Sequence, residues 1–459
     1  MASSLKFGTS GLRGLATELE GEEARRYAAA FVRYVETRGA VTAILVGRDL
    51  RESSAGIAHS VADALAALDV EVIDCGTLPT PALALESQRL DLPAIMVTGS
   101  HIPADRNGLK FYHHGEIDKT AEAGILAALD DAPSRPARHV RSEEALTRYR
   151  DRYAGLLPRS SLVGWRIGVW QHSLVMRDLM VEMLAHFGAH VVPLGRSETF
   201  VPVDTEAVSA ETIAMLAGWV REHGLKAVVS SDGDADRPLI VDETGEMIRG
   251  DVVGILTAKF LRADVVVTPV TSNSSIEHTR LFKRVVRTRV GSPYVIAAME
   301  AAREDGNVVG FEANGGVLLG SPVQINGTTL AALPTRDAML PILAMLGAAH
   351  QAGSFSKLVA SLPPRFARSD RLEHVPAERS TALMTQLGKD ASRFFIEQGR
   401  VASVSDIDGL RFELGTGDVI HYRPSGNAPE LRCYTEAATA ARADALLAWG
   451  LKAAAKIVH

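Results

Sequence analysis

Three aspartates at alternate positions stand in the middle of the chain, in the segment DGDADR that follows the apolar run AVVSS. In an extended segment, Asp232, Asp234 and Asp236 project to the same side. Carboxylates about 5 Å apart repel by roughly 3 kcal/mol per pair at an effective dielectric constant of about 20. A hard divalent cation removes this repulsion and accepts oxygen ligands, and Mg²⁺ commonly takes only a few carboxylates. The segment therefore predicts a magnesium site.

Two other interpretations of this segment are open. An acidic surface turn would need no metal, but turns seldom place three aspartates directly after a buried strand. A calcium-binding EF-hand loop shares the spacing and would end on Glu243. Its sixth position requires glycine, however, and Arg237 stands there, after a strand rather than a helix. We therefore reject the EF-hand, and the bare turn is the weaker alternative.

A second polar loop, TGSHIPAD, follows the apolar run that begins at position 94. A serine beside a glycine at the end of a buried strand can expose its hydroxyl group, which makes Ser100 a candidate functional residue. His101 and Lys110 add groups that carry protons or positive charge nearby in the sequence. The G-x-S-x-G pattern of lipases is absent. Taken alone, such a loop is more often ordinary turn chemistry than a functional site.

Two further loops carry groups that suit anions or sugar hydroxyls. The N-terminal FGTSGLRG offers backbone N–H groups, two hydroxyls and Arg13 to an anion, or is simply a flexible end of the chain. The loop GFEANGG contains Glu312 and Asn314, whose carboxylate and amide could hydrogen-bond sugar hydroxyls. Considered alone, a turn at the end of a strand is the better explanation of that loop.

The loop RPSGNAP lies between two predicted strands near the end of the chain. It combines a guanidinium fork, a hydroxyl, an amide and free backbone N–H groups, which together can surround a phosphate. The residues concerned are Arg423, Ser425, Gly426 and Asn427. An ordinary Pro/Gly turn is an equal alternative.

Short apolar runs alternate with alanine-rich amphipathic stretches, the first of which predicts a helix over residues 22–38. The runs recur in three sets of three, beginning at positions 42, 70 and 94, at 166, 189 and 227, and at 264, 284 and 307. Each third run enters a polar loop, at Ser100, Asp232 and Glu312. One supersecondary plan used three times is expected. Because ligands gather at the carboxyl ends of strands in α/β sheets, the three loops are candidates for one shared site.

The predicted fold class is α/β, with three similar α/β domains and a smaller C-terminal α+β domain. The last domain is predicted from strands over residues 403–414, 418–424 and 431–437, followed by an alanine-rich helix. The expected domains are residues 1–140, 141–250, 251–362 and 363–459.

Composition excludes several classes of protein. The chain has 459 residues, with 49 Lys and Arg against 55 Asp and Glu, so its formal net charge is −6 and nucleic-acid binding is not expected. The apolar run over residues 338–349 contains Pro341 and is too short to span a bilayer. No apolar signal segment opens the chain, and Cys75 and Cys433 are too few for a disulfide framework. We therefore expect a cytoplasmic protein.

Taken together and in this order, the five loops resemble those of the α-D-phosphohexomutase family, which includes phosphomannomutases and phosphoglucomutases. The resemblance covers nearly the whole chain and implies three mixed-sheet α/β domains and a phosphate-binding α+β domain around a central cleft. It also implies reversible phosphoryl transfer between the 1- and 6-positions of a hexose phosphate, through a phosphoserine and a 1,6-bisphosphate intermediate. Mg²⁺ would be the cofactor, and a hexose 1,6-bisphosphate the activator.

The resemblance assigns a role to each loop. The phosphoryl group would be carried by Ser100, which would also be a metal ligand beside Asp232, Asp234 and Asp236. The groups expected around the transferring phosphate are Arg13, His101, Lys110 and Arg237, with Lys110 proposed for proton transfer. The groups expected to bind the substrate are Arg289, Glu312, Asn314, Arg423, Ser425, Gly426 and Asn427.

Three segments depart from the family pattern. Many relatives carry Ser-Gly-His in the sugar loop, where residues 314–316 are Asn-Gly-Gly, and some carry His or Lys beside Arg289. Residues 427–428 are Asn-Ala in place of Thr and an acidic residue. Mannose is ranked first; the alternatives are a phosphoglucomutase, a phosphoglucosamine mutase or a non-catalytic sugar-phosphate-binding relative. We expect a hexose phosphate partner, no nucleic acid or membrane partner, and a monomer or homodimer.

Overall fold

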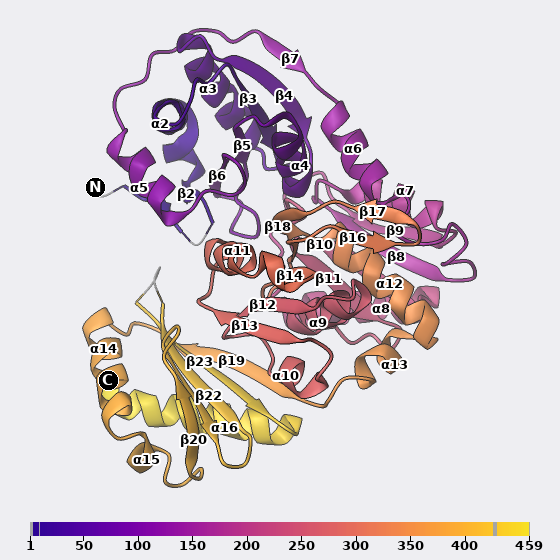
Figure 1. The fold of residues 1–459 in the computed structure, drawn as a ribbon, viewed down its shortest axis with the longest axis vertical. Helices are drawn as coiled ribbons and strands as arrows, with labels where there is room; N and C mark the ends of the chain where they lie inside the picture. The colour runs from indigo at the N-terminus through magenta and orange to yellow at the C-terminus, as the bar shows by residue number, and fades with distance from the viewer. Residues whose placement is uncertain (1–2, 9, 426–428, 459) are drawn as a thin grey trace. The chain divides into compact units, whose positions relative to one another are not determined.

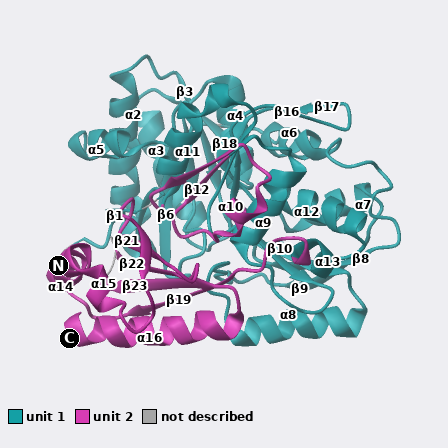
Figure 2. Cartoon of the chain, turned by 60° about the horizontal axis from the view of Figure 1, so that its bottom comes forward, with its two compact units in different colours: residues 1–265, 291–359 teal, residues 266–290, 360–459 magenta. Residues whose placement is uncertain are grey.

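A computed structural model describes residues 3–8, 10–425 and 429–458, and the chain divides into two compact units. Unit 1 contains residues 1–265 and 291–359, and unit 2 contains residues 266–290 and 360–459 (Figure 2). Figure 1 follows the chain from the indigo N-terminus to the yellow C-terminus.

The first sheet of unit 1 has seven strands in the order β1-β2-β6-β5-β3-β4-β7. Its central strands β3, β4 and β5 are parallel, whereas β6 returns antiparallel to β5. The strands are β1 (Lys6–Phe7), β2 (Leu12–Leu15), β3 (Ala43–Arg48), β4 (Glu71–Thr77), β5 (Ala94–Val97), β6 (Arg106–Tyr112) and β7 (His139–Arg141). The principal helices of this region are α2 (Ala24–Glu36), α3 (Ser54–Ala67), α4 (Thr80–Leu90) and α5 (Lys119–Ala127).

The predicted helix over residues 22–38 is confirmed by α2. Its apolar side chains at three-and-four spacing lie in the core of the first sheet, among them Tyr27, Phe31 and Val35. Phe31 packs on Phe111 of β6 with ring centroids 4.9 Å apart. The amphipathic pattern therefore exists because one side of α2 covers this sheet.

The second sheet of unit 1 has the order β11-β10-β8-β9. β8 pairs in parallel with both β9 and β10, and β11 returns antiparallel to β10. The strands are β8 (Arg166–His172), β9 (His190–Arg196), β10 (Ala227–Ser231) and β11 (Pro238–Asp242). The helices that pack on this sheet are α7 (Arg177–His186) and α8 (Ala210–His223). The preceding helix α6 (Glu144–Tyr153) packs on α4, and α9 (Gly250–Phe260) packs on β14 of the next strand group.

A third group of strands in unit 1 is antiparallel, with β15 between β14 and β18. The strands are β14 (Val308–Phe311), β15 (Val317–Leu319) and β18 (Leu333–Asp337), with the ribbon β16 (Val323–Ile325) and β17 (Thr328–Leu330). The helices are α11 (Ser292–Ala301), α12 (Met339–Ala352) and α13 (Phe355–Ala360). The apolar run noted over residues 338–349 is buried core helix α12, with Pro341 in its first turn. Among the described residues, no helix combines the length and apolar character needed to cross a membrane.

Each site loop of unit 1 is the turn of a β-hairpin, which the sequence analysis did not predict. β5 and β6 flank the loop of Ser100, β10 and β11 flank the loop of Asp232, and β14 and β15 flank the loop of Glu312. The predicted apolar runs are all strands. Of the return strands, β6 begins with polar residues and β15 has only three residues, whereas β11 is a buried and largely apolar strand that the pattern of three runs left out. The recurring plan is therefore a strand, a polar loop and an antiparallel return.

Unit 2 contains an antiparallel sheet in the order β19-β23-β22-β21-β20, which confirms the α+β tail. Its strands are β19 (Phe366–Leu372), β20 (Val401–Ser405), β21 (Leu410–Leu414), β22 (Val419–Pro424) and β23 (Leu431–Ala437). Its helices are α14 (Ala377–Lys389), α15 (Ala391–Phe394) and α16 (Ala440–Val458). The unit also takes in α10 (Ser275–Thr279), β13 (Arg284–Thr288) and, apart from its first residue, β12 (Val265–Pro269). Cys433 on β23 and Cys75 on β4 are both buried and unpaired.

His421 on β22 is buried as a neutral imidazole. Its Nε2–H donates to the carbonyl oxygen of Asp408 at 2.6 Å, its Nδ1 has no partner, and its ring stacks on Tyr434. Burial lowers the pKa of His421 from 6.5 to about 4. The unfolded chain therefore binds more protons than the folded chain between these pH values, and the stability of unit 2 falls as the pH drops from 6.5 towards 4.

We predict that His421→Gln flattens this pH dependence. A neutral amide can keep the bond to Asp408 but takes up no proton, so the loss of up to about 3 kcal/mol attributable to His421 over the interval disappears. Hydrogen exchange of the β22 amides at pH 7 and pH 4.5, in wild type and variant, measures this change in the stability of unit 2. His223→Gln, a half-buried change at the end of α8 in unit 1, is the control. If the protection of β22 in His421→Gln changes with pH as much as it does in wild type, the prediction is wrong.

Candidate functional site

The loop of Ser100 is held in one shape by a buried arginine. The Arg51 guanidinium donates to the carbonyl oxygens of Ser100 and Ile102 at 3.0 and 2.6 Å, and to those of Pro103 and Arg106 at 2.7 and 2.9 Å. Ser100 itself has a left-handed backbone, with φ of 55°, which is uncommon for a residue with a side chain. Four bonds to one guanidinium thus maintain a turn that would otherwise be unfavourable.

The aspartate loop is fixed by three segments that are distant in sequence. The backbone N–H groups of Val175, Thr80 and Ala338 donate to successive carbonyl oxygens of residues 233–235, at 3.1, 2.9 and 3.2 Å. A Cβ at Gly233 would lie 3.1 Å from the carbonyl oxygen of Ser100 and 2.9 Å from the Phe200 ring, so only glycine fits without a shift. The loop therefore lies where the three strand groups of unit 1 meet.

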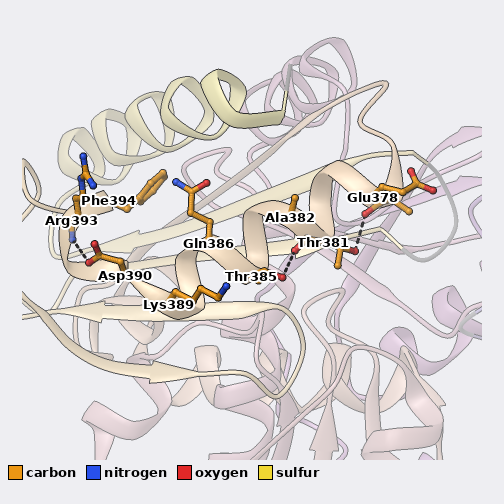
Figure 3. A pocket seen from close by; sticks show the side chains of 10 residues that line it. Glu378, Thr381, Ala382, Thr385, Gln386, Lys389, Asp390, Arg393 and Phe394 are labelled. Carbon is orange, nitrogen blue, oxygen red and sulfur yellow. Dashed lines mark hydrogen bonds between the residues drawn. The ribbon is translucent and has the colours of Figure 1, made fainter.

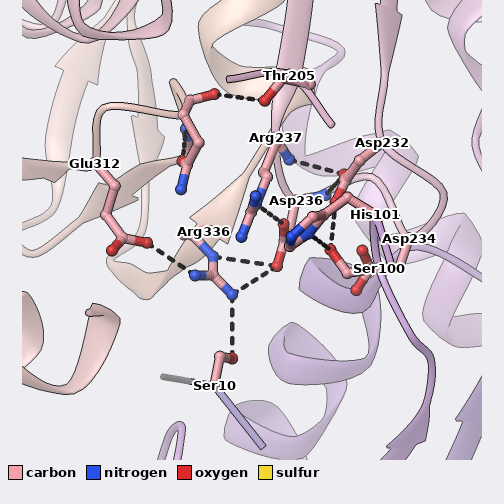
Figure 4. A network of polar contacts seen from close by, with 12 residues as sticks. Ser10, Ser100, His101, Thr205, Asp232, Asp234, Asp236, Arg237, Glu312 and Arg336 are labelled. Atoms are coloured by element: carbon pink, nitrogen blue, oxygen red, sulfur yellow. Dashed lines mark hydrogen bonds and ion pairs between the residues drawn. The ribbon is translucent and has the colours of Figure 1, made fainter. Parts of the chain in front are cut away.

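The structure brings Ser100 and the three aspartates together (Figure 4). Ser100 Oγ donates to Asp232 Oδ2 at 2.5 Å, although 132 residues separate them in sequence. All three aspartates are buried. One carboxylate oxygen of each lies within 4.8 Å of the corresponding oxygens of the other two. The shared site expected for these two loops is thus present.

Hydrogen bonds divide the oxygens of two aspartates into engaged and unengaged atoms. Lys110 Nζ donates to Asp234 Oδ2 and Asp236 Oδ2, each at 2.7 Å, and Thr80 Oγ1 donates to Asp234 Oδ2 at 2.6 Å. The buried Oδ1 atoms of Asp234 and Asp236 have no hydrogen-bond partner. Buried carboxylate oxygens without a donor suit a hard cation, so the residues present fit Mg²⁺.

The carboxyl pKa values of Asp232 and Asp236 are shifted in opposite directions. Burial raises the pKa of Asp232 well above its usual value, and the charges of Asp236 and Asp234 raise it further. Burial also raises the pKa of Asp236, but Arg336 and Lys110 outweigh it and hold that pKa well below its usual value. The pKa of Asp232, the aspartate that contacts Ser100, is therefore shifted in the opposite direction to that of Asp236.

The predicted cationic residues surround this loop. Arg237 Nε lies 3.7 Å from Asp236 Oδ1, and burial beside Arg237 and Arg336 lowers the pKa of Arg13 to about 10. Although burial lowers the pKa of Lys110, Asp234 and Asp236 raise it above its usual value, so Lys110 is a charged ammonium.

His101 lies beside the serine hydroxyl, with Nδ1 3.2 Å from Ser100 Oγ. Burial, together with the charges of Arg237 and Arg13, holds the pKa of His101 far below its usual value. His101 is therefore a neutral ring beside the serine.

The loop of Glu312 reaches the same place. Arg336 Nη1 donates to Glu312 Oε2 at 2.8 Å, and Arg336 Nη2 donates to Asp236 Oδ2 at 2.9 Å. Asn314 turns its side chain back onto its own loop, where Oδ1 accepts from Gly316 N at 2.9 Å, and its carbonyl oxygen accepts from Thr205 at 3.1 Å. The carboxylate thus faces the aspartate loop, whereas the predicted sugar contact of Asn314 has no observation behind it.

Several residues of this network were not found in the sequence. Arg51, Thr80 and Arg336 lie far apart along the chain and belong to no chemical motif. Ser10 is one of the two hydroxyls noted in FGTSGLRG, but its contact with Arg336 was not expected. The only signal for Arg51 is its place directly after a predicted strand, in GRDLR. Their roles arise from contacts that only the folded chain creates.

The remaining predicted substrate residues lie in unit 2. Arg423 Nε donates to Asp408 Oδ2 at 2.8 Å, and the backbone N–H of Val290 donates to the same oxygen at 3.0 Å. Asp408 therefore brings the segment of exposed Arg289 beside the RPSGNAP loop. In that loop, Ser425 N donates to the carbonyl oxygen of Glu430 at 2.9 Å. Gly426 and Asn427 lie outside the described residues.

A hollow of about 1250 Å³ in unit 2 has a different lining (Figure 3). Its walls come from α14, α15 and the residue between them, with Lys389 and Arg393 balanced by Glu378 and Asp390. None of the predicted site residues lines it. Balanced charge gives this hollow no preference for a phosphate, so it is not the candidate site.

Comparisons with known proteins agree with this geometry. The chain matches four descriptions of phosphoglucomutase/phosphomannomutase domains: alpha/beta/alpha domain I over residues 4–135, domain II over 153–245, domain III over 249–366, and the C-terminal domain over 367–448. The chain belongs to the phosphoglucomutase/phosphomannomutase family, a branch of the α-D-phosphohexomutases, and has its four domains.

Among its relatives, a phosphomannomutase of Sinorhizobium fredii is 52% identical, covering 97% of this chain and 98% of that protein. A phosphomannomutase of Salmonella muenchen is 43% identical, covering 95% and 92%. In the solved structure of a phosphoglucomutase/phosphomannomutase family protein from Burkholderia thailandensis the fold is similar, with a TM-score of 0.78, 22% identity and 98% coverage of both chains.

We predict that Arg51→Met loosens the Ser100 loop. The four carbonyl oxygens would lose their donor and Asp49, whose Oδ2 lies 3.3 Å from Arg51 Nε, would lose its buried partner, at a cost of about 3–5 kcal/mol. Hydrogen exchange over residues 98–106 should accelerate. Arg48→Met, a half-exposed change on β3, is the control; equal protection in both variants would contradict the prediction.

Proposed function

We propose that this protein is a phosphomannomutase, which moves a phosphoryl group reversibly between the 1- and 6-positions of mannose phosphate. The observation that carries the proposal is the contact of Ser100 Oγ with Asp232 inside a buried aspartate cluster. The two phosphomannomutases at 52% and 43% identity support mannose as the sugar. A cytoplasmic location and a monomeric or dimeric state stay predictions.

In the proposed cycle, phosphorylated Ser100 gives its phosphoryl group to the free hydroxyl of a mannose monophosphate. The resulting 1,6-bisphosphate reorients in the site, and its other phosphoryl group is transferred to Ser100. Each transfer forms one P–O bond and breaks another. Because Ser100 is phosphorylated again at the end of every cycle, a small amount of hexose 1,6-bisphosphate suffices to load the enzyme. Such transfers depend mainly on positioning and on stabilising negative charge.

The aspartate loop is the proposed magnesium site, with Asp232, Asp234, Asp236 and an oxygen at Ser100 as ligands. A bound Mg²⁺ would neutralise negative charge on the phosphoryl oxygens. The unpartnered Oδ1 atoms of Asp234 and Asp236 support this assignment.

The surrounding residues have separate proposed roles. Arg13 and Arg237 would stabilise the charge of the transferring phosphoryl group. Lys110 carries a proton in its ion pairs with two aspartates, which supports a role as charge carrier or proton donor, and neutral His101 is positioned to contact Ser100 Oγ. Glu312 and Asn314 would bind the sugar.

Arg289 and the RPSGNAP residues Arg423, Ser425, Gly426 and Asn427 would hold the phosphate that is not reacting. The shared contact of two loops with Asp408 supports this role for Arg289 and Arg423.

The first prediction tests the nucleophile. Ser100→Ala should abolish phosphoenzyme formation and reduce interconversion of mannose 1- and 6-phosphates by at least about 10³-fold, because no hydroxyl remains to carry the phosphoryl group. Wild type and variant are compared with Mg²⁺ and a trace of hexose 1,6-bisphosphate, and intact-mass spectra record phosphorylation. Ser197→Ala, at an exposed loop, is the control. Full activity of Ser100→Ala would refute this mechanism.

The sugar is tested by running wild type on mannose, glucose and glucosamine phosphates. We expect the highest kcat/KM with mannose 1-phosphate. A preference for glucose or glucosamine phosphate would replace mannose in the proposal, and binding without turnover on any of them would favour the non-catalytic alternative.

The metal is tested with Asp234→Asn. We expect activity to need at least about tenfold more Mg²⁺, because the amide supplies a weaker ligand oxygen and no negative charge. Asp444→Asn, on the exposed start of α16, is the control. An unchanged Mg²⁺ titration would exclude Asp234 as a ligand.

A further inference from the structure

Arg336 on β18 lies between two loops with different proposed roles (Figure 4). Its Nη1 donates to Glu312 Oε2 at 2.8 Å, and its Nε and Nη2 donate to Asp236 Oδ2 at 3.1 and 2.9 Å. Its Nη2 also donates to Ser10 Oγ at 3.1 Å. One buried guanidinium therefore joins the sugar loop, the aspartate loop and the N-terminal loop.

The sugar loop makes room for this side chain at Gly316. A Cβ at that position would lie 2.8 Å from Arg336 Cδ and 2.8 Å from the carbonyl oxygen of Asp236. Real Cβ atoms are hardly ever found so close, and the carbonyl belongs to a loop held by three backbone bonds. Gly316 and Arg336 therefore form a matched pair, in which the absence of one side chain admits the other.

The strand that carries Arg336 is firmly anchored. The neighbouring Asp337 accepts hydrogen bonds from the buried hydroxyls of Tyr149 and Tyr153, both on α6. The residue after Asp337, Ala338, donates its backbone N–H to the carbonyl oxygen of Ala235 in the aspartate loop. A guanidinium on such a support can set the relative position of the groups that it contacts.

We propose that Arg336 is a positioning residue that fixes Glu312 against Asp236, and that position 316 is glycine because the aliphatic stem of Arg336 and the Asp236 carbonyl oxygen occupy that space. The inference rests on the proposed function, in which Glu312 binds the sugar and Asp236 binds the metal. By engaging Oδ2 of Asp236 together with Lys110, Arg336 leaves Oδ1 without a hydrogen-bond donor and available to a cation. By engaging Oε2 of Glu312, it orients that carboxylate towards the substrate.

A positioning role and a purely structural role predict different kinetics. A residue that only stabilises the fold lowers the fraction of active protein, and therefore the apparent kcat, without changing the KM of the molecules that fold. Loss of Arg336 as a positioning residue should instead raise both the KM for mannose 1-phosphate and the Mg²⁺ concentration required.

The principal variant is Arg336→Lys, which keeps the charge but cannot bridge two carboxylates with a planar fork. We expect the KM and the required Mg²⁺ each to rise by about tenfold, by analogy with other small displacements of positioned groups. Calorimetric binding of mannose 6-phosphate, measured in the non-reacting Ser100→Ala background with and without Arg336→Lys, should weaken by a similar factor. Arg303→Lys, an exposed change in the turn that follows α11, is the control.

The second variant changes the partner rather than the arginine. Gly316→Ala should displace the guanidinium and reproduce the effects of Arg336→Lys, and the double variant should be little worse than either change alone. Gly218→Ala on α8, where a Cβ would meet nothing within 4 Å, is the matched control. Thermal melting identifies any variant that does not fold. If either Arg336→Lys or Gly316→Ala does not fold, the kinetics of the other variant test the proposal.

Two results would overturn the inference. If Arg336→Lys or Gly316→Ala folds and keeps wild-type KM, Mg²⁺ dependence and sugar-phosphate affinity, Arg336 does not position the site. If the two folded variants have independent, multiplicative effects, they are not a pair. Both results require an active wild type, so they are distinct from failure of the proposed function, in which wild type itself would not turn over any hexose phosphate.

Discussion

Electrostatic repulsion among three buried carboxylates is the constraint on which the rest of unit 1 depends. Asp232, Asp234 and Asp236 are each almost wholly removed from solvent. Such an arrangement is stable only when positive charge is supplied nearby. Lys110 and Arg336 supply it by direct contact. These cations engage the Oδ2 atoms of Asp234 and Asp236 and leave the Oδ1 atoms without a hydrogen-bond donor, so the interactions that stabilise the fold also leave oxygens available to a cation.

The three hairpins explain how loops so distant in sequence meet with such accuracy. Each loop is closed by a pair of antiparallel strands, so its ends are fixed by ladder hydrogen bonds. Arg51 then holds the Ser100 loop through its carbonyl oxygens, and backbone donors from three other segments hold the aspartate loop. Chemistry that relies on positioning benefits from such rigidity, because a displacement of about 1 Å can cost a factor of 100 in rate.

Much of this could be predicted from the sequence because the signals are local. Apolar runs separated by amphipathic stretches specify strands and helices through neighbours along the chain, and the nine runs and helix α2 were found in this way. The loop at Asp232 was recognised for a similar reason, since its residue types and spacing suffice to suggest metal chemistry. The loop at Ser100 is a weak signal alone, and its role was expected only from the order of all five loops. The return strands β6, β11 and β15 were missed because no local pattern in the sequence shows that each pairs back onto the strand before it.

By itself, the sequence determined the α/β plan, the α+β tail, the five polar loops and the family to which they belong. Only the tertiary structure decided which oxygens of the aspartates are engaged, that Arg51 supports the serine loop, and that Arg336 occupies the space beside Gly316. The physical reason is that these features depend on contacts between residues that lie far apart along the chain, from 20 positions for Gly316 and Arg336 to 326 for Ser10 and Arg336. No local pattern encodes such contacts; they arise when separate strands and helices pack into one core.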